Sequence, residues 1–413
     1  MQESINAQVT GIILAGGQGT RLFPLTQTRC KPAVGFGGKF RLIDIPVSNA
    51  LNSGITDLFV ISQYFVPHLQ EHLTSTYHFD IFRRSQIRIL APEEHPLSKV
   101  CFAGSGDAVR KNLEELLKTP CSHFLILCGD QVYNIDFQQI LNRAKETDAD
   151  LVIASLIVEE KEAKRMGVLK VDQTGKIIDF FEKPKDPETL DKFTLPHKGS
   201  PRFLGSMGIY VFKREALVDL LQQKGDDFGL HLIPLQIKKG KTFSYIYEGY
   251  WVDIGTVASF HKANLDLLGR VSCLNVYDEE RPIYTKSQKL PGPFIQNSQI
   301  ENSIISEGCM IEEGEIHKSV IGLRSIVQKG TKIYNSILMG NPSYSPPSSP
   351  KKFSIGKNCL IKNSIIDEQV HIGNNVQLVN KENLKQFDGN GIYIRDGIII
   401  VAAGADLPDN FIL

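Results

Sequence analysis

Through residue 265, short apolar runs alternate with longer amphipathic stretches. Four runs predict buried strands: VTGIILAG (9–16), ITDLFVISQY (55–64), HFLILCGD (123–130) and DLVIASLIV (150–158). Between them, residues 106–119 and 134–149 carry Leu, Ile and Val at the three- to four-residue spacing of a helix. Strands that alternate with helices predict a Rossmann-like α/β domain with a mostly parallel sheet. Its ligands should bind at the carboxyl ends of the strands.

After residue 265 the apolar positions recur every five or six residues. They are Ile300, Ile305, Ile311, Ile316, Ile321, Val327, Ile333, Leu338, Ile355, Ile361, Ile366, Ile372 and Leu378. A helix repeats at 3.6 residues and a flat strand at 2, so neither explains this spacing. A period near six, with Gly or Asn often nearby, predicts a left-handed parallel β-helix. An antiparallel sandwich explains the placement of Gly and Asn less well.

One segment interrupts the six-residue repeat. Residues 340–353 hold four prolines and four serines, which predicts a loop. The chain of 413 residues exceeds the usual size of a single core, so two domains are expected. We predict an α/β domain over 1–265, a linker over 266–290 and a β-helix domain over 291–413.

Composition narrows the class of protein. Hydrophobic residues make up 42% and charged residues 22%, as in soluble enzymes. Lys+Arg and Asp+Glu both number 46, which argues against a polyanion-binding surface, so no nucleic acid partner is expected. The seven cysteines form no C-x-x-C pair, and the N-terminus shows no basic leader before an apolar run. We expect a cytoplasmic protein without a membrane partner, or a plastid protein if a transit peptide has been removed.

The stretch LAGGQGTRLFPLT (14–26) ends the first predicted strand with a glycine turn. It is not a Walker loop, because no Gly-Lys-Ser/Thr follows, and Leu22 replaces the third glycine of the dinucleotide fingerprint. Bare glycine backbone and a following helix start suit an anion, and Arg21 and Lys31 add positive charge. The residues alone leave open whether this turn binds phosphate or is structural.

The same stretch, continued by CKPAV (30–34), resembles the signature of sugar-1-phosphate nucleotidyltransferases. FGGKFRLIDIPVSNALNSGI (36–55) resembles the glucose-1-phosphate adenylyltransferases (ADP-glucose pyrophosphorylases) in particular. Further similar strings are SMGIYVF (206–212), YWVDIGT (250–256), SVIGLRS (319–325) and IGKNCLIKNSIID (355–367). The resemblance therefore covers nearly the whole chain.

The resemblance implies transfer of AMP from ATP to α-D-glucose 1-phosphate, which gives ADP-glucose and pyrophosphate for glycogen- or starch-type α-glucan synthesis. A sugar phosphate oxygen attacks the α-phosphorus in line, so positioning and cations lower the barrier. Mg²⁺ is the implied cofactor, with Asp130 and Asp253 as its oxygen ligands. No general base is needed, because the attacking phosphate is already ionised.

The resemblance also implies roles for single residues. Arg21, Lys31 and Asp130 would be catalytic, with Arg21 gripping the phosphates that leave as pyrophosphate. The nucleotide would be bound by Leu14, Ala15, Gly16, Gly17, Gly19, Thr20, Gln63, Gly104, Ser105 and Asp107. Gln63 is expected near the adenine and Gly104 under the base or ribose. The sugar phosphate would be bound by Gly167, Glu182, Lys183, Ser206 and Asp253, with Glu182 on the glucose hydroxyls and Lys183 on the phosphate.

Three positions depart from the family pattern. Gly106 stands in GSGDA (104–108) where the family usually has alanine, and we expect it to loosen the backbone near the base. Gln131 follows the metal aspartate in place of histidine, so it donates a hydrogen bond but carries no charge. His231 replaces an acidic residue. These changes bear on nucleotide preference and rate.

Regulation is a further family trait. Such enzymes are typically tetramers whose activators bind between the domains through lysines, and Lys39, Lys362 and Lys381 stand at such positions. We therefore expect a homotetramer, or one with a related subunit.

Three alternatives remain. One is a related enzyme using UTP, another nucleotide or another sugar. A second is a non-catalytic regulatory subunit, although Arg21, Lys31, Asp130, Lys183 and Asp253 are all present. The third is an acyltransferase, which would need a histidine such as His317 or His371 in a repeat loop.

Overall fold

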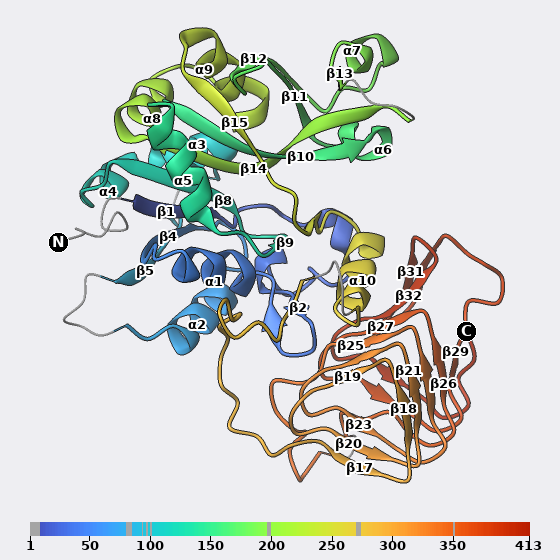
Figure 1. Cartoon of the computed structure of the whole chain (residues 1–413). Helices are drawn as coiled ribbons and strands as arrows, with labels where there is room; N and C mark the ends of the chain where they lie inside the picture. The colour runs from blue at the N-terminus through green and yellow to red at the C-terminus, as the bar shows by residue number, and fades with distance from the viewer. Residues whose placement is uncertain are drawn as a thin grey trace.

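The N-terminal part is built around one mixed sheet (Figure 1). The structure is a computed structural model that describes residues 9–79, 85–92, 94–95, 98–99, 101–195, 200–269, 274–349 and 352–413. The strand order is β12-β11-β14-β8-β1-β4-β5. Strands β10 and β13 also pair with β14, and β15 pairs with β10. The strands of the main path are β1 (Val9–Leu14), β4 (Asp57–Ile61), β5 (Gln86–Leu90), β8 (His123–Cys128), β11 (Gly167–Val171), β12 (Ile177–Glu182) and β14 (Arg202–Lys213).

The strands β8, β1, β4 and β5 are parallel, as the alternation of strands and helices predicts. Strand β14 runs antiparallel to β8 and to β10 (Leu151–Glu159), and β10 pairs in parallel with β15 (Thr242–Ile246). All four predicted strands are present, within a few residues of their predicted ends. The predicted α/β class is confirmed, and the antiparallel β14 is the part that the pattern did not predict.

Both faces of the parallel strands are buried. Ile13 and Leu127 pack into one apolar cluster, whereas their neighbours Ile12 and Ile126 pack into another on the opposite face. The first face is covered by α1 (Asp44–Asn52), α2 (Val66–Thr76) and α5 (Phe137–Glu146). The second is covered by α3 (Ser105–Lys111), α4 (Leu113–Leu117), α8 (Arg214–Leu221) and α9 (Ile233–Lys239). Thus the helix predicted over 106–119 is two short helices, and that over 134–149 is α5.

Shorter elements complete this part. They are β2 (Gly35–Phe36), β3 (Phe40–Arg41), β6 (Glu94–His95), β7 (Ser98–Lys99), β9 (Gln131–Tyr133), β13 (Thr194–Leu195), β16 (Trp251–Asp253), α6 (Glu160–Ala163), α7 (Pro187–Asp191) and α10 (Val257–Asp266). Strands β11 and β12, with α6 and α7, form a lobe above the parallel strands (Figure 1). This lobe carries the predicted sugar-phosphate residues Gly167, Glu182 and Lys183.

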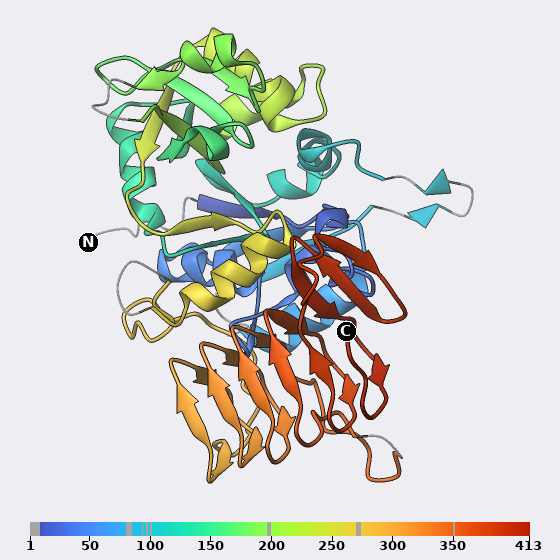
Figure 2. The same cartoon turned by 90° about the vertical axis from the view of Figure 1, so that its right-hand side faces the viewer.

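The C-terminal part is a parallel β-helix whose coils are stacked side by side (Figure 2). Its strands are β17 (Phe294–Gln296), β18 (Gln299–Glu301), β19 (Ile304–Ile305), β20 (Met310–Glu312), β21 (Glu315–His317), β22 (Val320–Ile321), β23 (Ile326–Val327), β24 (Lys332–Tyr334), β25 (Ile337–Leu338), β26 (Leu360–Lys362), β27 (Ser364–Ile366), β28 (His371–Ile372) and β29 (Gln377–Leu378). On one face Ile300, Ile316, Ile333, Ile361 and Leu378 lie opposite one another from coil to coil. The apolar residues of the six-residue repeat therefore line the core, as predicted.

The corners of the coils explain why asparagine recurs. Asn297, Asn302, Asn335 and Asn363 each stand between two strands and have positive φ values of 46–49°. Among non-glycine residues, asparagine adopts this left-handed conformation most readily. The sharp turns at these four positions therefore have a local cause in the sequence.

The predicted loop leaves the stack of coils. Residues 340–349 contain no helix or strand, and residues 350–351 lie outside the described residues. On either side of the loop the coils still pair directly, with Lys332 opposite Leu360 and Ile337 opposite Ile365. The loop is thus a detour between two adjacent coils.

A C-terminal hairpin was not predicted. Strands β30 (Gln386–Asp388), β31 (Ile392–Arg395) and β32 (Ile398–Val401) pair antiparallel, and β32 then joins β27 in parallel. Strand β33 (Asp406–Leu407) returns to pair with β28. The hairpin reaches the N-terminal part, where the ring of Tyr393 packs edge-on against that of Phe23 at 5.2 Å.

The two parts share an apolar core and a buried ion pair. Val34 and Phe36 pack in one cluster with Ile365 and Ile400 of the β-helix. Close by, Arg29 forms ion pairs with Asp367 at 2.7 Å and with Glu368 at 2.9 Å. The β-helix is therefore held against the first domain by side chains from its coils.

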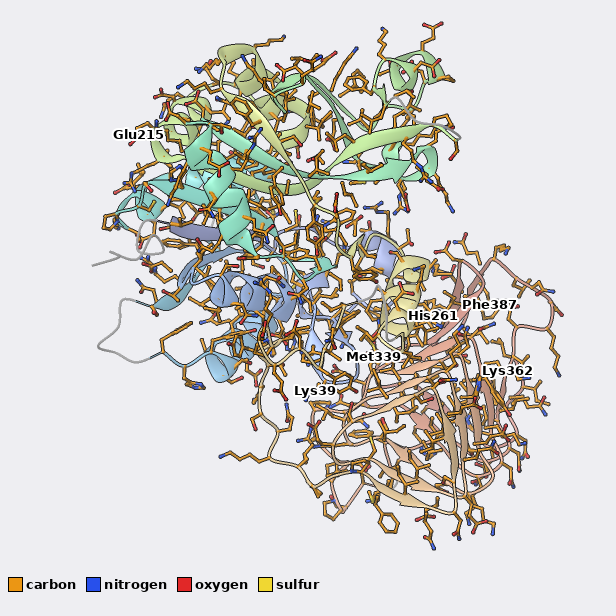
Figure 3. The ribbon with its side chains drawn as sticks, viewed as in Figure 1. Lys39, Glu215, His261, Met339, Lys362 and Phe387 are labelled. Carbon is orange, nitrogen blue, oxygen red and sulfur yellow. The ribbon has the colours of Figure 1, made fainter. Side chains whose placement is uncertain are left out.

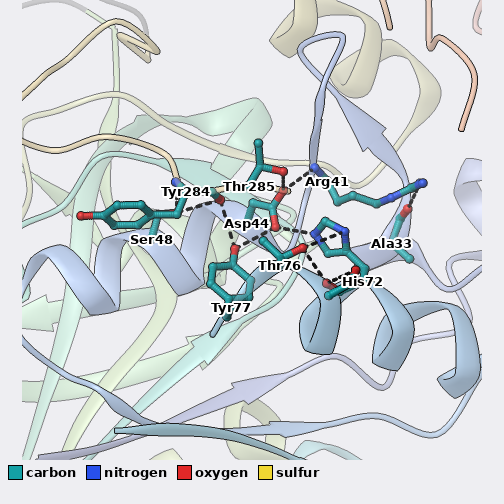
Figure 4. A network of polar contacts seen from close by, with 10 residues as sticks. Ala33, Arg41, Asp44, Ser48, His72, Thr76, Tyr77, Tyr284 and Thr285 are labelled. Atoms are coloured by element: carbon teal, nitrogen blue, oxygen red, sulfur yellow. Dashed lines mark hydrogen bonds and ion pairs between the residues drawn. The ribbon is translucent and has the colours of Figure 1, made fainter. Parts of the chain in front are cut away.

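The segment between the domains is also anchored (Figure 4). The buried Asp44 carboxylate accepts hydrogen bonds from the hydroxyls of Thr285 (2.7 Å) and Tyr77 (2.8 Å). The N–H of Tyr284 donates to the Ser48 hydroxyl at 2.8 Å. Helix α10 ends at Asp266 and β17 begins at Phe294, so the connection lies between them. The predicted boundaries at 265, 290 and 291 themselves stay predictions.

Candidate active site

The glycine turn follows β1 at the carboxyl edge of the sheet. Gly19 has φ +65°, and a Cβ at this position would lie 2.9 Å from Cγ2 of Thr26 and 3.1 Å from Cβ of Lys31. The Thr26 hydroxyl also donates to the Gly19 carbonyl at 2.9 Å. Both the backbone angle and the close packing therefore require glycine here.

The turn presents free donors. Among the described residues, the N–H groups of residues 16–20 donate to no protein acceptor, whereas that of Ala15 is bonded to the Ile61 carbonyl. Gly17, Thr20 and Arg21 are exposed, and Leu14, Gly16 and Gly19 are partly exposed. A row of unpaired N–H groups beside an arginine is suited to phosphate oxygens.

Lys31 lies between two carboxylates. Its Nζ is 2.5 Å from Oδ2 of Asp130 and 3.9 Å from Oδ1 of Asp253, and the residue is 8% exposed. Asp130 follows β8, and strand β9 places Gln131 opposite Asp253 on the antiparallel β16. This strand pairing brings together two aspartates that are far apart in the sequence.

The two carboxylates suit a cation. Burial is the main cause that raises the pKa of Asp253, and the neighbouring Asp130 raises it further. Lys31, Arg21 and Arg165 oppose this rise. Among the described residues no group of three or more His, Cys, Asp or Glu side chains is arranged for a metal ion. Two carboxylates are the kind of protein ligand that suits Mg²⁺, because this ion takes few protein carboxylates and completes its shell with water and phosphate oxygens.

Glu182 ends β12 in the lobe, and Lys183 follows it. The Glu182 carboxylate is 2.8 Å from the Lys183 Nζ. Its Oε2 lies 2.8 Å and 2.6 Å from the points that a Cβ at Gly167 and at Gly229 would occupy. The two glycines thus leave room for the carboxylate, which is 15% exposed, while Lys183 is 59% exposed. Lys183 is therefore accessible to an anion, although it is paired with Glu182.

Two family models match the chain. One, described as nucleotidyl transferase, matches residues 10–270, and the other, described as GLGC left-handed parallel beta-helix domain, matches residues 288–412. The chain belongs to the nucleotidyl transferase family. Together the matches indicate a sugar-1-phosphate nucleotidyltransferase, and the second supports the predicted left hand of the β-helix.

In this nucleotidyltransferase, three of the residues expected at the nucleotide have side chains fixed by hydrogen bonds. The Gln63 amide donates to the Gly16 carbonyl at 2.8 Å and accepts from the Phe102 N–H at 2.8 Å. The Ser105 hydroxyl donates to Asp227 at 3.0 Å. Asp107 accepts from the Ala103 N–H at 2.9 Å. Gln63 therefore links the glycine turn to the segment that leads into Gly104, and its contact with adenine stays a prediction.

The expectation that Gly106 loosens this region is wrong. A Cβ at Gly106 would lie 2.6 Å from Leu232 and 3.2 Å from the Asp226 carbonyl, so the glycine permits tight packing. His231, another of the three departures, accepts hydrogen bonds from the N–H groups of Asp226 and Asp227, both at 3.2 Å. It stabilises the loop that packs on Gly106.

Gln131 is fixed at both ends of its side chain. It donates to the Met207 carbonyl at 2.7 Å and accepts from Trp251 at 3.3 Å. On β14 next to Met207, the Ser206 hydroxyl accepts from the Gly208 N–H at 3.3 Å and is largely buried. Glutamine thus supplies one donor and one acceptor, which a neutral histidine also offers.

Two of the three predicted effector lysines, Lys39 and Lys362, lie apart from each other (Figure 3). Lys39 borders a cavity of about 560 Å³ between the domains, and its Nζ is 3.3 Å from Glu307. Lys362 lies on the outer side of the β-helix over the Tyr334 ring, and Lys381 bonds to Gln377 at 3.4 Å. Neither lines the cavity that Lys39 borders.

Sequence reasoning missed Arg165. It stands two residues before Gly167 in KRMGVL, within a stretch of charged residues that resembles an exposed turn. Its position next to a predicted sugar-phosphate residue is the one signal that would have identified it.

Proposed function

We propose that this nucleotidyltransferase transfers AMP from ATP to α-D-glucose 1-phosphate and releases pyrophosphate. The observation that supports this best is the placement of Lys31 between Asp130 and Asp253, beside the free N–H groups of the glycine turn. In the lobe, the Glu182 carboxylate and the Lys183 ammonium are the kinds of group that suit the hydroxyls and the phosphate of a sugar phosphate. The choice of ATP and glucose rests on the resemblance of residues 36–55.

The reaction needs orientation and positive charge. An ionised oxygen of the sugar phosphate attacks the α-phosphorus, and the bond to the β-phosphate oxygen breaks as pyrophosphate leaves. The turn and Arg21 would bind the β- and γ-phosphates, while Lys183 holds the attacking phosphate. Mg²⁺ held by Asp130 and Asp253 would neutralise charge on the phosphates.

Saturation curves with ATP and UTP, each with glucose 1-phosphate, test this proposal. We expect a higher kcat/KM with ATP, measured as pyrophosphate release. A higher value with UTP would make the chain a uridylyl enzyme. Turnover as low as that of Asp130→Ala with every nucleotide would make it a non-catalytic subunit.

We also propose that a phosphorylated metabolite regulates the enzyme at the cavity bordered by Lys39. Arg41, Lys286 and Arg324 line the same cavity. They outnumber its two carboxylates, Glu71 and Glu368, so its wall suits an anion. The same curves should shift when fructose 1,6-bisphosphate or 3-phosphoglycerate is added.

A homotetramer and a cytoplasmic or plastid location are part of this proposal. In the part of the chain that is described, no helix has the length and apolar character of a membrane span. Residues 1–8, on which the expectation about a leader depends, lie outside that part.

Arg21→Ala should lower kcat about 100-fold. It should raise the KM for glucose 1-phosphate much less, because Arg21 is placed to bind charge that develops on the leaving phosphates. Steady-state kinetics with both substrates varied measure the two effects, and Arg21→Lys is the control that keeps the charge. A change in the KM for ATP alone would show that the turn only binds the nucleotide.

A further inference from the structure

Arg165 is held at the junction between α6 and β11. Its N–H donates to the Glu162 carbonyl at 2.8 Å, directly after a helix whose start is capped by Glu159. The next residue, Met166, accepts a hydrogen bond from the Lys183 N–H at 3.0 Å. The backbone of Arg165 is therefore fixed relative to Lys183 in the lobe.

The side chain of Arg165 extends from the lobe to the opposite wall of the site. Its Nη2 lies 3.0 Å from the point that a Cβ at Gly255 would occupy, between β16 and α10. Around the same point lie Oδ2 of Asp253 at 2.8 Å and Nη1 of Arg21 at 3.6 Å. Three charged groups from three parts of the chain therefore meet at Gly255, where the absence of a side chain leaves them room.

The charge of Arg165 is not neutralised by a close partner. Within the described ranges, no carboxylate oxygen lies within 4.0 Å of its guanidinium and no hydrogen bond holds its side chain. Its positive charge still lowers the pKa of Asp253. The neighbouring Lys164, by contrast, is paired with Glu160 at 2.6 Å.

Two guanidinium groups close to each other repel unless an anion lies between them. Asp130 pairs with Lys31, which leaves the single negative charge of Asp253 for both arginines, and Asp253 is also the candidate metal ligand. A phosphate group that enters this space would contact both arginines, and the planar guanidinium binds two phosphate oxygens at once. The geometry therefore indicates a second phosphate position, between Arg165 and Arg21 and next to the N–H groups of the glycine turn.

We propose that Arg165 binds the phosphate of the sugar 1-phosphate and holds it opposite Arg21. This inference rests on the proposed function, since it assigns one residue to one of the two substrates. Arg165 belongs to the lobe that carries Gly167, Glu182 and Lys183, so its phosphate is that of the sugar. Arg21 belongs to the turn, so its phosphates are those of the nucleotide.

Arg165→Ala should raise the KM for glucose 1-phosphate about tenfold, while the KM for ATP changes less than twofold. Arg165→Lys should lie between this variant and the wild type, because lysine keeps the charge but loses the planar fork. Lys164→Ala is the matched control, since Lys164 precedes Arg165 and points to Glu160. Calorimetric titration with glucose 1-phosphate gives the same comparison without turnover. Arg165 is exposed, so its loss should leave the melting temperature unchanged.

The outcomes separate this inference from the proposed function. If the wild type releases pyrophosphate but Arg165→Ala has the KM of Lys164→Ala, the assignment of Arg165 is wrong and the function stands. If only the KM for ATP rises, Arg165 binds the nucleotide and the assignment is again wrong. If the wild type shows no turnover and no heat of binding with glucose 1-phosphate, the proposed function itself fails.

Discussion

Asp130→Asn should lower kcat by about 1,000-fold while the protein stays folded. The substitution keeps the shape of the side chain but removes the charge that lies 2.5 Å from the Lys31 Nζ. Two consequences follow, because the candidate metal pair loses one ligand and the buried Lys31 loses its nearest counter-charge. Lys31 would then turn toward Asp253, which lies 3.9 Å away, and leave its position beside the phosphates.

Pyrophosphate release at saturating ATP, glucose 1-phosphate and Mg²⁺ measures this effect. Asp136→Asn is a suitable control, because Asp136 lies on the same segment but caps α5 by accepting from the Gln138 N–H at 3.0 Å. Asparagine caps a helix as well as aspartate, so this control should keep its kcat. A kcat for Asp130→Asn within threefold of the control would exclude the Asp130 carboxylate from the reaction.

The largest effect on stability should follow from Arg29→Met. The Arg29 side chain is 7% exposed and pairs with the Asp367 side chain, which is 1% exposed, across the junction of the domains. Burial already raises the pKa of Asp367, and Arg29 is the group that most opposes this rise. Without Arg29 the buried carboxylate has no partner. Removal of one member of a buried ion pair lowers the free energy of unfolding by about 3–5 kcal/mol.

Urea unfolding followed by the fluorescence of Trp251, the single tryptophan, measures this loss. The destabilisation should shrink as the pH falls, because Asp367 with a raised pKa takes up a proton in the variant and its burial then costs less. The double variant Arg29→Met/Asp367→Asn should recover part of the stability at neutral pH. Equal stability of the wild type and Arg29→Met, or no recovery in the double variant, would show that the pair does not hold the junction.

Much of the fold was predictable because buried positions recur in the sequence as regularly spaced apolar residues. The parallel strands are apolar on both faces, and each coil of the β-helix places one residue such as Ile316 or Ile333 in the core. The direction of a strand relative to its neighbours has no effect on this periodicity, so the antiparallel pairing of β14 was not predicted. The C-terminal hairpin was missed because its strands pair locally and follow no six-residue repeat.

The candidate site was predictable to the extent that it lies at strand ends. The glycine turn after β1 and Asp130 after β8 are separated by more than a hundred residues, yet their strands are neighbours. The packing of Gly106 was not predictable, since it depends on Leu232 and on a loop distant in sequence. Arg165 was missed for a similar reason, because the course of a long charged side chain depends on what surrounds it in the fold.

At the loop over residues 340–349, two coils that are adjacent in space are far apart in the sequence. Adjacent coils are usually paired at a step of 16 or 17 residues, but across the loop Lys332 pairs with Leu360 at a step of 28. The pairing is the same in both cases, so extra residues in this loop do not displace the coils. A lineage of this enzyme can therefore lengthen or replace the loop, and acquire a new recognition segment there, while every coil keeps its place beneath the catalytic domain.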